Sequence, residues 1–494
     1  MRGRPAFVLP ENFSTVLGQC TNTRPVQALA GTGSGRTHLE VDSVTPNTQP
    51  GASSLPAGIE NVFVFAIFNA LSFQIVLGSP MVLYAKSLDA SATVLGIIAG
   101  MMPLLVIFQI PAANHVARIG YKRFVFAGWW TRVMFIFAMA VIPLTGGFLE
   151  SATQLVLMLF LLFCFNLSRG ISSAAWLPWI TALVPLEVRG RYLAREAGCV
   201  HIASFLSLAL AAFSLGRDPR SWQFAVLFGF SAIAGMISLS FLKRIPEVQP
   251  PEAEVASAMP VPWREIASYG PFHKLLRMVV AWSVAYGGLG AFTVDYLKTE
   301  AAMGDGSILL VMGLAFLGGL AGLGYFESRT DRLGSKPVVT FCLIVWVLIM
   351  LGWFLLSAEV LQPKLGIVLV LELFMGFAYA LVNMNNTRLA MALVPPMGRS
   401  HFFALYSVVA NLTLGLSPVL WGLVIDAFGS RRFHWPALEV NRFSFFFLCV
   451  LAAFVVALVF CRRIDEPKAR DMDELISELL QSPQKLWLRL WPRG

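Results

Sequence analysis

The sequence predicts an all-α membrane protein in which twelve transmembrane helices form two pseudo-symmetric bundles of six. Three observations support this fold class: an apolar composition, twelve long apolar runs and an internal repeat. Of the 494 residues, 57% are hydrophobic and 13% are charged, and the mean hydropathy is +0.70. Soluble domains contain about 25% charged residues. The composition therefore indicates a chain surrounded by lipid.

Each apolar run is long enough to cross a hydrocarbon layer of about 30 Å. Because lipid cannot bond to backbone groups, runs of this length and uniform apolarity indicate helices rather than the alternating strands of a barrel. The runs span residues 60–85, 91–115, 123–146, 153–183, 192–215, 221–242, 275–297, 306–326, 337–357, 364–393, 401–427 and 441–461.

The chain divides into five segments. Residues 1–59 are rich in Gly, Ser, Thr and Pro without periodicity, which predicts a disordered cytoplasmic tail; a start codon assigned too far upstream is the alternative explanation. Residues 60–243 and 274–463 hold six runs each, joined by a proline-rich linker with an interfacial segment at 244–273. Residues 464–494 contain an amphipathic pattern with Trp, Arg and Lys, so we expect a tail along the inner membrane surface.

Basic residues in the short connections predict the orientation. With the N-terminus in the cytoplasm, the inner connections hold fifteen Lys and Arg and the outer ones eight. Because cytoplasmic loops are enriched in Lys and Arg, we expect both termini on the cytoplasmic side of the plasma (inner) membrane. The net charge of +9 then indicates contact with anionic lipid rather than with nucleic acid.

An internal repeat relates the two halves. The segment ALVPLEVRGRYLA begins at Ala182, and ALVPPMGRSHFFA begins at Ala392, 210 residues later. The segments ARIGYK, from Ala117, and DRLGSK, from Asp331, correspond at an offset of 214. This pattern is typical of transporters that are built from parallel structural repeats.

Twelve spans, a long middle loop and the DRLGSK segment resemble the major facilitator superfamily, whose signature between helices 2 and 3 is G-x-x-x-D-R-x-G-R-R. The resemblance covers residues 60–463. In this family the Asp of the signature caps and pairs at helix ends and holds the inward gate; the first copy here has Ala117 at that position. The resemblance implies gating roles for Arg118, Gly120, Lys122, Asp331, Arg332, Gly334 and Lys336, with Arg189 and Arg399 from the other repeat.

The fourth run contains an arginine at its centre. An arginine there costs about 2.5–3.5 kcal/mol on insertion scales, so a water-filled cavity or a partner must offset it. At 100° per residue, Ser173 and Trp176 fall within about 40° of Arg169. The resemblance implies a central cavity lined by helices 1, 4, 7 and 10, into which this stripe would point. The alternative is that Arg169 bonds to backbone carbonyls or a neighbouring acid.

The tenth run carries a matching polar stripe around Glu372. Tyr379, Asn383 and Asn386 lie within about 40° of it, and the 210-residue offset maps Arg169 onto Tyr379. A carboxyl group buried between helices can exchange a proton, so Glu372 is the candidate proton-coupling residue. The alternatives are a hydrogen-bonded neutral acid and a pair with Arg169 or Arg132. For Arg132 itself we expect packing or pairing, with Trp129 stacked on it.

These observations predict a secondary transporter that moves a small polar, possibly anionic solute by alternating access, with protons as the candidate coupling ion. The predicted substrate-binding residues are Arg169, Ser173, Trp176, Tyr379, Asn383, Asn386, Asn69 and Tyr286. The alternative is a superfamily fold that acts as a sensor or membrane-protein assembly factor. No catalytic cluster, metal-ligand spacing or Walker motif is present in the sequence, so we expect no enzyme activity, metal or cofactor. We expect a monomer in the bilayer.

Overall fold

The computed structural model describes residues 58–248, 268–394, 399–435, 438–466, 469–470 and 472–477. Within them, twelve helical spans are long and apolar enough to cross a membrane, which confirms the predicted number. The spans are Glu60–Ser87, Ala92–Val116, Tyr121–Gly147, Ser151–Leu183, Tyr192–Leu215, Ser221–Leu242, Gly270–Thr299, Asp305–Phe326, Ser335–Ser357, Leu365–Leu393, Phe402–Phe428 and Arg442–Arg462. The largest difference from the sequence prediction is the start of the seventh span, expected at 275 and found at Gly270.

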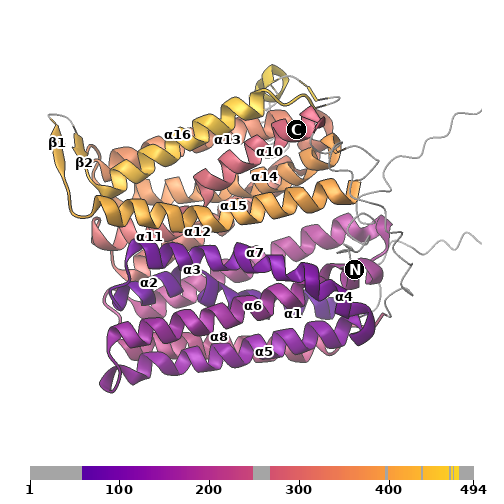
Figure 1. Ribbon diagram of the computed structural model, residues 1–494, viewed down its shortest axis with the longest axis horizontal. Helices are drawn as coiled ribbons and strands as arrows, with labels where there is room; N and C mark the ends of the chain where they lie inside the picture. The colour runs from indigo at the N-terminus through magenta and orange to yellow at the C-terminus, as the bar shows by residue number, and fades with distance from the viewer. Residues whose placement is uncertain are drawn as a thin grey trace, which may run out of the picture.

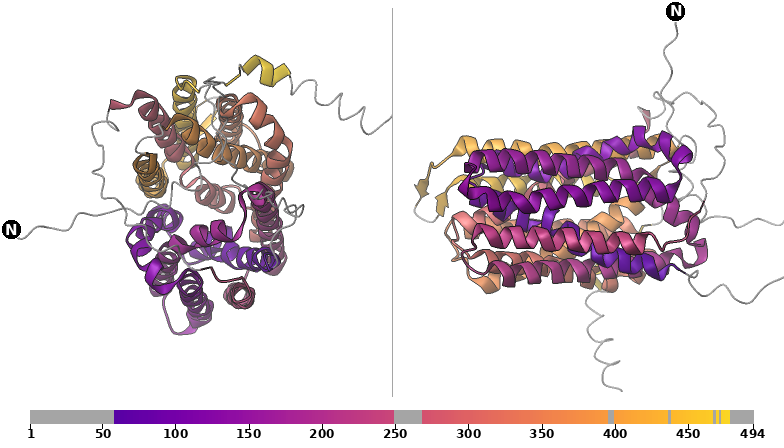
Figure 2. Two further views of the ribbon diagram at one scale, coloured as in Figure 1. Left: turned by 90° about the vertical axis from the view of Figure 1, so that its right-hand side faces the viewer. Right: turned by 90° about the horizontal axis from the view of Figure 1, so that it is seen from below.

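The first six spans form one half of the molecule and the last six form the other (Figure 1). The N-half contains α1 (Glu60–Leu77), α2 (Ser79–Ser87), α3 (Ala92–Leu105), η2 (Val106–Phe108), α4 (Gln109–Ile119), α5 (Tyr121–Val141), η3 (Ile142–Gly147), α6 (Ser151–Leu183), α7 (Leu186–Leu215) and α8 (Ser221–Leu242). The C-half contains α10 (Gly270–Tyr286), α11 (Leu289–Thr299), α12 (Asp305–Leu333), α13 (Ser335–Ser357), α14 (Leu365–Leu393), α15 (Arg399–Phe428), β1 (Phe433–Trp435), β2 (Leu438–Val440) and α16 (Arg442–Arg462). Seen end-on, the two groups of helices lie side by side (Figure 2).

The two ends of the molecule carry different structures. One end, the hairpin face, contains the antiparallel β1–β2 hairpin, in which His434 pairs with Glu439. At the opposite end, the terminal face, α1 begins and α16 ends (Figure 1). The sequence did not predict the hairpin, because its two strands have only three residues each.

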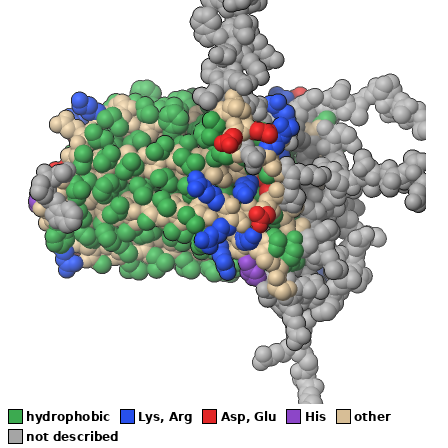
Figure 3. Space-filling view, turned by 90° about the horizontal axis from the view of Figure 1, so that it is seen from above, with side chains coloured by type: hydrophobic (Ala, Val, Ile, Leu, Met, Phe, Trp, Pro, Cys, Tyr) green, Lys and Arg blue, Asp and Glu red, His purple; other side chains and the backbone are tan. Residues whose placement is uncertain are grey.

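A broad apolar belt crosses the face of the molecule shown in Figure 3, between charged residues toward its two ends. Large side chains on this belt are well exposed, among them Phe160, Phe213 and Leu348. A continuous apolar surface of this extent is unfavourable in water but matches a bilayer interior. The belt therefore agrees with the spans in identifying a membrane protein.

The first span of each half is interrupted at equivalent places. Gly78 is extended between α1 and α2, and Pro80 lies in the first turn of α2, where a missing N–H costs no helical hydrogen bond. In the C-half, Gly287 and Gly288 separate α10 from α11. Gly288 has φ +78°, and a Cβ atom placed on it would lie 3.0 Å from Pro418 of α15. Glycine is required there by both backbone conformation and close packing.

The repeat found in the sequence is also a repeat of local conformation. Gly120 and Gly334 precede α5 and α13 with φ values of +88° and +90°. The cap residues Val184 and Val394 are both extended, with ψ values of 113° and 128°. These pairs keep the sequence offsets of 214 and 210.

Aromatic contacts extend this equivalence to the helix packing. Tyr192 lies 5.4 Å from Phe63 in the N-half, and Phe402 lies 4.9 Å from Phe272 in the C-half, measured between ring centroids. Tyr192 and Phe402 are both buried. The same contact therefore joins the first and fifth spans of each half.

Candidate functional site

Arg169 lies in the middle of α6, halfway along a 33-residue helix. Its side chain is half-buried, and its Nε atom is buried with no hydrogen-bond partner. Within the described part of the chain, neither a backbone carbonyl nor a carboxylate bonds to this guanidinium. A membrane-embedded charge without a protein partner is unfavourable. The Arg169 guanidinium is therefore available to bind a group from outside the protein.

The neighbours of Arg169 on α6 make mostly local hydrogen bonds. The Ser173 hydroxyl donates to the carbonyl of Gly170 at 2.7 Å and lies 3.4 Å from Gln109 Oε1 of α4. Asn166 donates to the carbonyl of Leu162, which leaves its buried Oδ1 without a partner. The face of α6 that the sequence predicted to be polar thus retains an unused acceptor beside the arginine.

Asn69 belongs to the interior of the N-half. Its Oδ1 accepts from Trp129 Nε1 at 3.2 Å and from an Arg132 N–H at 3.0 Å. Its oxygen thus holds two neighbours in place, and a substrate contact by Asn69 stays a prediction.

Trp176 belongs to an aromatic cluster near the same place. Its ring centroid lies 5.1 Å from Phe65, 6.0 Å from Trp129 and 6.1 Å from Trp179. The expected stacking of Trp129 on Arg132 is confirmed, at 4.6 Å from the guanidinium carbon to the ring centroid. This cluster joins α1, α5 and α6, and Trp176 lies two turns after Arg169 on α6.

Glu372 on α14 is 3% exposed, and its Oε1 has no hydrogen-bond partner in the described chain. The structure forms neither the hydrogen-bonded acid nor the ion pair with Arg169 or Arg132 that the sequence left open. Burial of an unpaired carboxylate is costly. The arrangement therefore suits a group that is neutral in this state.

Two tyrosines of the C-half stack on each other, and one of them lies two turns after Glu372 on α14. Tyr286, at the end of α10, stacks on Tyr379 of α14 with ring centroids 4.5 Å apart and an interplanar angle of 14°. The other face of Tyr286 meets Trp282 at 5.4 Å. Tyr379 keeps 37% of its surface exposed. The structure thus brings together two of the predicted site residues from the first and fourth spans of this half.

The asparagines of α14 differ in their surroundings. Asn383 is exposed, whereas Asn386 is 5% exposed and its Oδ1 has no partner. Asn385, which the sequence analysis did not select, is fully buried with a free Oδ1, while its amide donates to the carbonyl of Leu381.

Polar contacts join the two halves at the hairpin face. Asp426, near the end of α15, accepts from the backbone N–H groups of Ala92 and Thr93 at 3.0 and 2.8 Å, and from the Thr93 hydroxyl at 2.6 Å. These N–H groups form the first turn of α3, where a helix has free donors and a favourable dipole for a carboxylate. Beside them, Lys86 forms an ion pair of 3.0 Å with the buried Asp295 of α11.

Close backbone packing accompanies these contacts. Cβ atoms placed on Gly96 and Gly100 of α3 would collide with the carbonyl oxygens of Pro418 and Gly415 of α15. The halves also meet at the end of α7 and the start of α12, where the N–H groups of Asp305 and Gly306 donate to the carbonyls of Arg217 and Gly216. The hairpin face is therefore closed by two sets of contacts between the halves, one between α3 and α15 and one between the end of α7 and the start of α12.

The same turn geometry appears in both halves where the sequence predicted gating residues on the terminal face. Glu466 accepts from the N–H groups of Ser335 and Lys336 at 3.1 and 2.7 Å, and so caps α13 behind Gly334. In the N-half, a Cβ atom placed on Gly120 would lie 3.8 Å from Glu247 Oε1. The two acids belong to the segments RIPE and RIDE after α8 and α16, a third repeat that could have been found in the sequence.

The remaining predicted gating residues are less defined. Arg118 and Arg332 are exposed, and Lys122 is half-buried. The side chains of Asp331, Arg189 and Arg399 lie outside the described residues, as do most of the linker and of the two tails. The described part of the C-terminal tail is helical at Met472–Ser477, where Leu475 is buried against the C-half and Ile476 is exposed.

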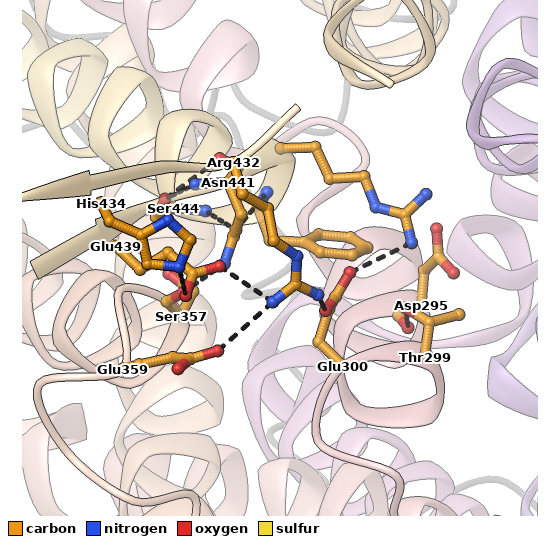
Figure 4. Close-up of polar contacts among 12 residues, drawn as sticks. Asp295, Thr299, Glu300, Ser357, Glu359, Arg432, His434, Glu439, Asn441 and Ser444 are labelled. Atoms are coloured by element: carbon orange, nitrogen blue, oxygen red, sulfur yellow. Dashed lines mark hydrogen bonds and ion pairs between the residues drawn. The ribbon is translucent and has the colours of Figure 1, made fainter. Parts of the chain in front are cut away.

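An ion cluster fixes the β1–β2 hairpin to the C-half (Figure 4). Arg432 lies 2.7 Å from Glu300 just after α11, 2.9 Å from Glu439 of β2 and 3.6 Å from Glu359 after α13. The negative charge of Glu300, followed by that of Glu439, raises the pKa of Arg432 above its ordinary value. We call these four residues the Arg432 cluster; sequence analysis did not identify it because its members are far apart in the chain.

The match to known proteins covers nearly all of this architecture. The family model of the Major Facilitator Superfamily matches residues 62–330 and 294–493. The chain therefore belongs to the major facilitator superfamily. Because this is a family of transporters, the expectation that the chain is not an enzyme is confirmed.

Individual relatives are distant. The chain is 23% identical to Autophagy-related protein 22-1 of Aspergillus clavatus over 232 residues, which cover 44% of this chain and 36% of that protein. It is 29% identical to an uncharacterized MFS-type transporter of Pseudomonas aeruginosa over 202 residues, which cover 40% and 46% of the two chains. The chain thus spans less than half the length of these relatives.

Solved structures share the fold. A D-xylose–proton symporter superposes with a TM-score of 0.65 at 14% identity, covering 83% of this chain and 99% of the symporter. The nucleoside transporter NupG gives a TM-score of 0.57 at 12% identity, with coverage of 82% and 98%. At these identities the similarity establishes the twelve-helix architecture.

Proposed function

We propose that this protein is a secondary transporter that moves a small anionic solute by rocking its two halves about a site between α6 and α14. Arg169 binds the anionic group. Ser173, Tyr379, Asn383 and Asn386 supply hydrogen bonds, and aromatic side chains wall the site. The superfamily's cavity-lining helices are the first, fourth, seventh and tenth spans, and these carry the residues named here.

One observation carries the proposal: Arg169 is a half-buried guanidinium at the centre of a membrane-spanning helix without a protein partner. A guanidinium offers planar N–H donors that match carboxylate and phosphate oxygens. A bound anion therefore supplies the negative charge and the hydrogen-bond acceptors that the protein does not provide.

Proton coupling follows from Glu372 on the opposite half. In the state described, in which the hairpin face is closed, this carboxyl group is buried and unpaired. It is therefore best accommodated as the neutral acid. Opening toward water on either side lets it exchange a proton. One proton thereby moves with the anion and reduces the charge that crosses the membrane.

The orientation of the transport cycle follows from the basic residues. We place the terminal face in the cytoplasm, because it contains most of the Lys and Arg of the short connections. The closed hairpin face then lies outside, and the state described is the one that exchanges solute with the cytoplasm. The protein is proposed to work as a monomer in the cytoplasmic membrane.

A ligand screen tests this function. Purified protein in detergent is heated with a panel of metabolites, and ligands that raise the melting temperature are followed by uptake into liposomes. We expect Arg169→Ala to abolish both the shift and the uptake, whereas Arg195→Ala, which removes an exposed arginine of α7, leaves them intact. Uptake that is equal in Arg169→Ala and the parent protein would refute the role of Arg169.

A further inference from the structure

A second arginine lies beside Arg169 and is more deeply buried. Arg132 of α5 is 4% exposed, and its guanidinium lies 5.2 Å from the ring of Phe165, one turn before Arg169 on α6. Arg132 therefore packs against the helical turn of α6 that leads to Arg169. Two like charges thus share one apolar region of the N-half.

No acid in the described N-half compensates them. Arg132 bonds only to the neutral oxygen of Asn69, and its buried Nε has no partner. Between Glu60 and Glu187 the sequence contains two acids, Asp89 and Glu150, and both lie in loops at the hairpin face. The aromatic rings of Trp129 and Phe165 stabilise the cation through their faces, but they do not neutralise it.

We propose that Arg132 and Arg169 together select a solute whose anionic group carries two negative charges, such as a phosphate monoester or a short dicarboxylate. This inference rests on the proposed function, because it assigns the substrate class of the same site. Arg169 contacts the solute directly. Arg132 is a specificity-determining residue that acts from behind Arg169: a monoanion leaves one positive charge uncompensated, whereas a dianion neutralises both.

The position of Arg132 suits this role better than a purely structural one. A residue needed only for packing can be apolar at the same volume, and replacing buried ion pairs by apolar groups is frequently neutral for stability. Here a charge is retained without any counter-charge. Asn69 orients the guanidinium by accepting one N–H, which leaves other donors free.

Tryptophan fluorescence of the full chain in detergent gives a direct test, because Trp129 contacts Arg132 and lies 6.0 Å from Trp176. The probes are inorganic phosphate at pH 8, sulfate and malonate, compared with chloride and acetate at matched ionic strength. We expect a saturable change with the dianions at concentrations at least tenfold below those needed for the monoanions.

Variants separate a role in specificity from a role in folding. Arg132→Gln is expected to remove the tenfold preference for dianions while monoanion binding persists, and Arg132→Lys is expected to restore most of the preference. Arg195→Gln serves as the matched control, because it removes an exposed guanidinium of the N-half that stacks on Phe63. If Arg132→Gln does not fold, the test rests on the parent protein and Arg132→Lys, which should both prefer dianions to monoanions.

The failures are distinguishable. A preference that survives in Arg132→Gln but disappears in Arg169→Gln would overturn the role of Arg132 and leave the proposed function in place. An equal response to monoanions and dianions in the parent protein would overturn the substrate class. The absence of a saturable response to every anion would overturn both proposals.

Discussion

At the scale of single residues, each half presents one ionisable side chain without a partner. Arg169 and Glu372 both lack hydrogen-bond partners at buried atoms in the described chain, yet they do not neutralise each other. A direct ion pair would hold the halves together in one state. Keeping the two groups apart leaves Arg169 free to bind an anion and Glu372 free to exchange a proton as the halves move.

Glu372→Gln is expected to uncouple transport from the proton gradient. Glutamine keeps the shape of the neutral acid but cannot release a proton, so solute exchange should persist while uptake driven by a pH gradient is lost. Uptake of the solute identified by screening is measured in liposomes with and without the gradient. Glu150→Gln, which changes an exposed acid at the start of α6, is the control. Gradient-driven uptake by Glu372→Gln would contradict the coupling role.

Two asparagine substitutions should affect different properties, one the stability of the protein and the other its ligand binding. Asn69→Ala removes the acceptor for both Trp129 and the buried Arg132, so we expect a loss of about 1–3 kcal/mol in stability and a lower melting temperature. Asn383→Ala changes an exposed side chain and should weaken ligand binding without lowering that temperature. The reverse assignment of stability and binding effects would show that Asn69 faces the solute.

The site residues differ in how well the sequence alone could predict their roles. Arg169 and Glu372 could be predicted because charges are rare in apolar runs and helical periodicity places polar neighbours around them. The role of Asn69 could not be predicted, because it depends on α1 and α5 meeting at Trp129 and Arg132. A pattern within one helix does not reveal its neighbours.

At the scale of helices, the crossing of α3 and α15 depends on glycine. Gly96→Ala should lower stability by about 1–3 kcal/mol, as overpacking does, because the new Cβ atom would collide with the Pro418 carbonyl. Gly229→Ala is the matched control, since nothing lies within 4 Å of a Cβ atom placed there on α8; the higher helix propensity of alanine should leave it equally or slightly more stable. Melting temperatures in detergent measure both. Equal effects would mean that the crossing is not tight.

The Arg432 cluster predicts a modest and pH-independent contribution. Arg432→Gln removes contacts with three carboxylates, but the arginine is 44% exposed, so each pair contributes at most about 1 kcal/mol. An arginine is charged in the unfolded chain at ordinary pH, and the raised pKa keeps Arg432 charged in the folded protein. Its own titration therefore affects stability only at strongly alkaline pH. We expect a lower melting temperature than in Arg431→Gln, with the same difference at pH 7 and pH 9.

At the scale of the whole molecule, duplication explains why the fold could be predicted and the closure could not. Lipid fixes the length and apolarity of each span, and the repeated ALVP and DRLG-type segments reveal the two halves. The equivalent glycine conformations at Gly120 and Gly334 confirm that relationship. The contacts that close the hairpin face have no such signal, because they join residues that are far apart in the sequence, such as Lys86 with Asp295.

Asp426 is the contact through which closure can be weakened without disturbing either half. Its carboxylate binds two N–H groups and one hydroxyl at the start of α3, and all of these bonds cross between the halves. Asp426→Asn removes the charge that favours the helix N-terminus and keeps one acceptor. The seam between α3 and α15 should therefore open more often. Each half should keep its own packing, because the contacts within it are unchanged.

Hydrogen exchange can measure this opening. In Asp426→Asn the amides of residues 92–95 should exchange several-fold faster, while amides inside α5 and α13 exchange as before. Asp89→Asn is the control: Asp89 is an exposed acid in the loop just before α3, and asparagine tolerates its φ of +61°. Faster exchange throughout the C-half would indicate general destabilisation, and unchanged exchange at 92–95 would show that Asp426 does not hold the hairpin face closed. A selective effect would identify this carboxylate as a latch that must release before the site can face the other side of the membrane.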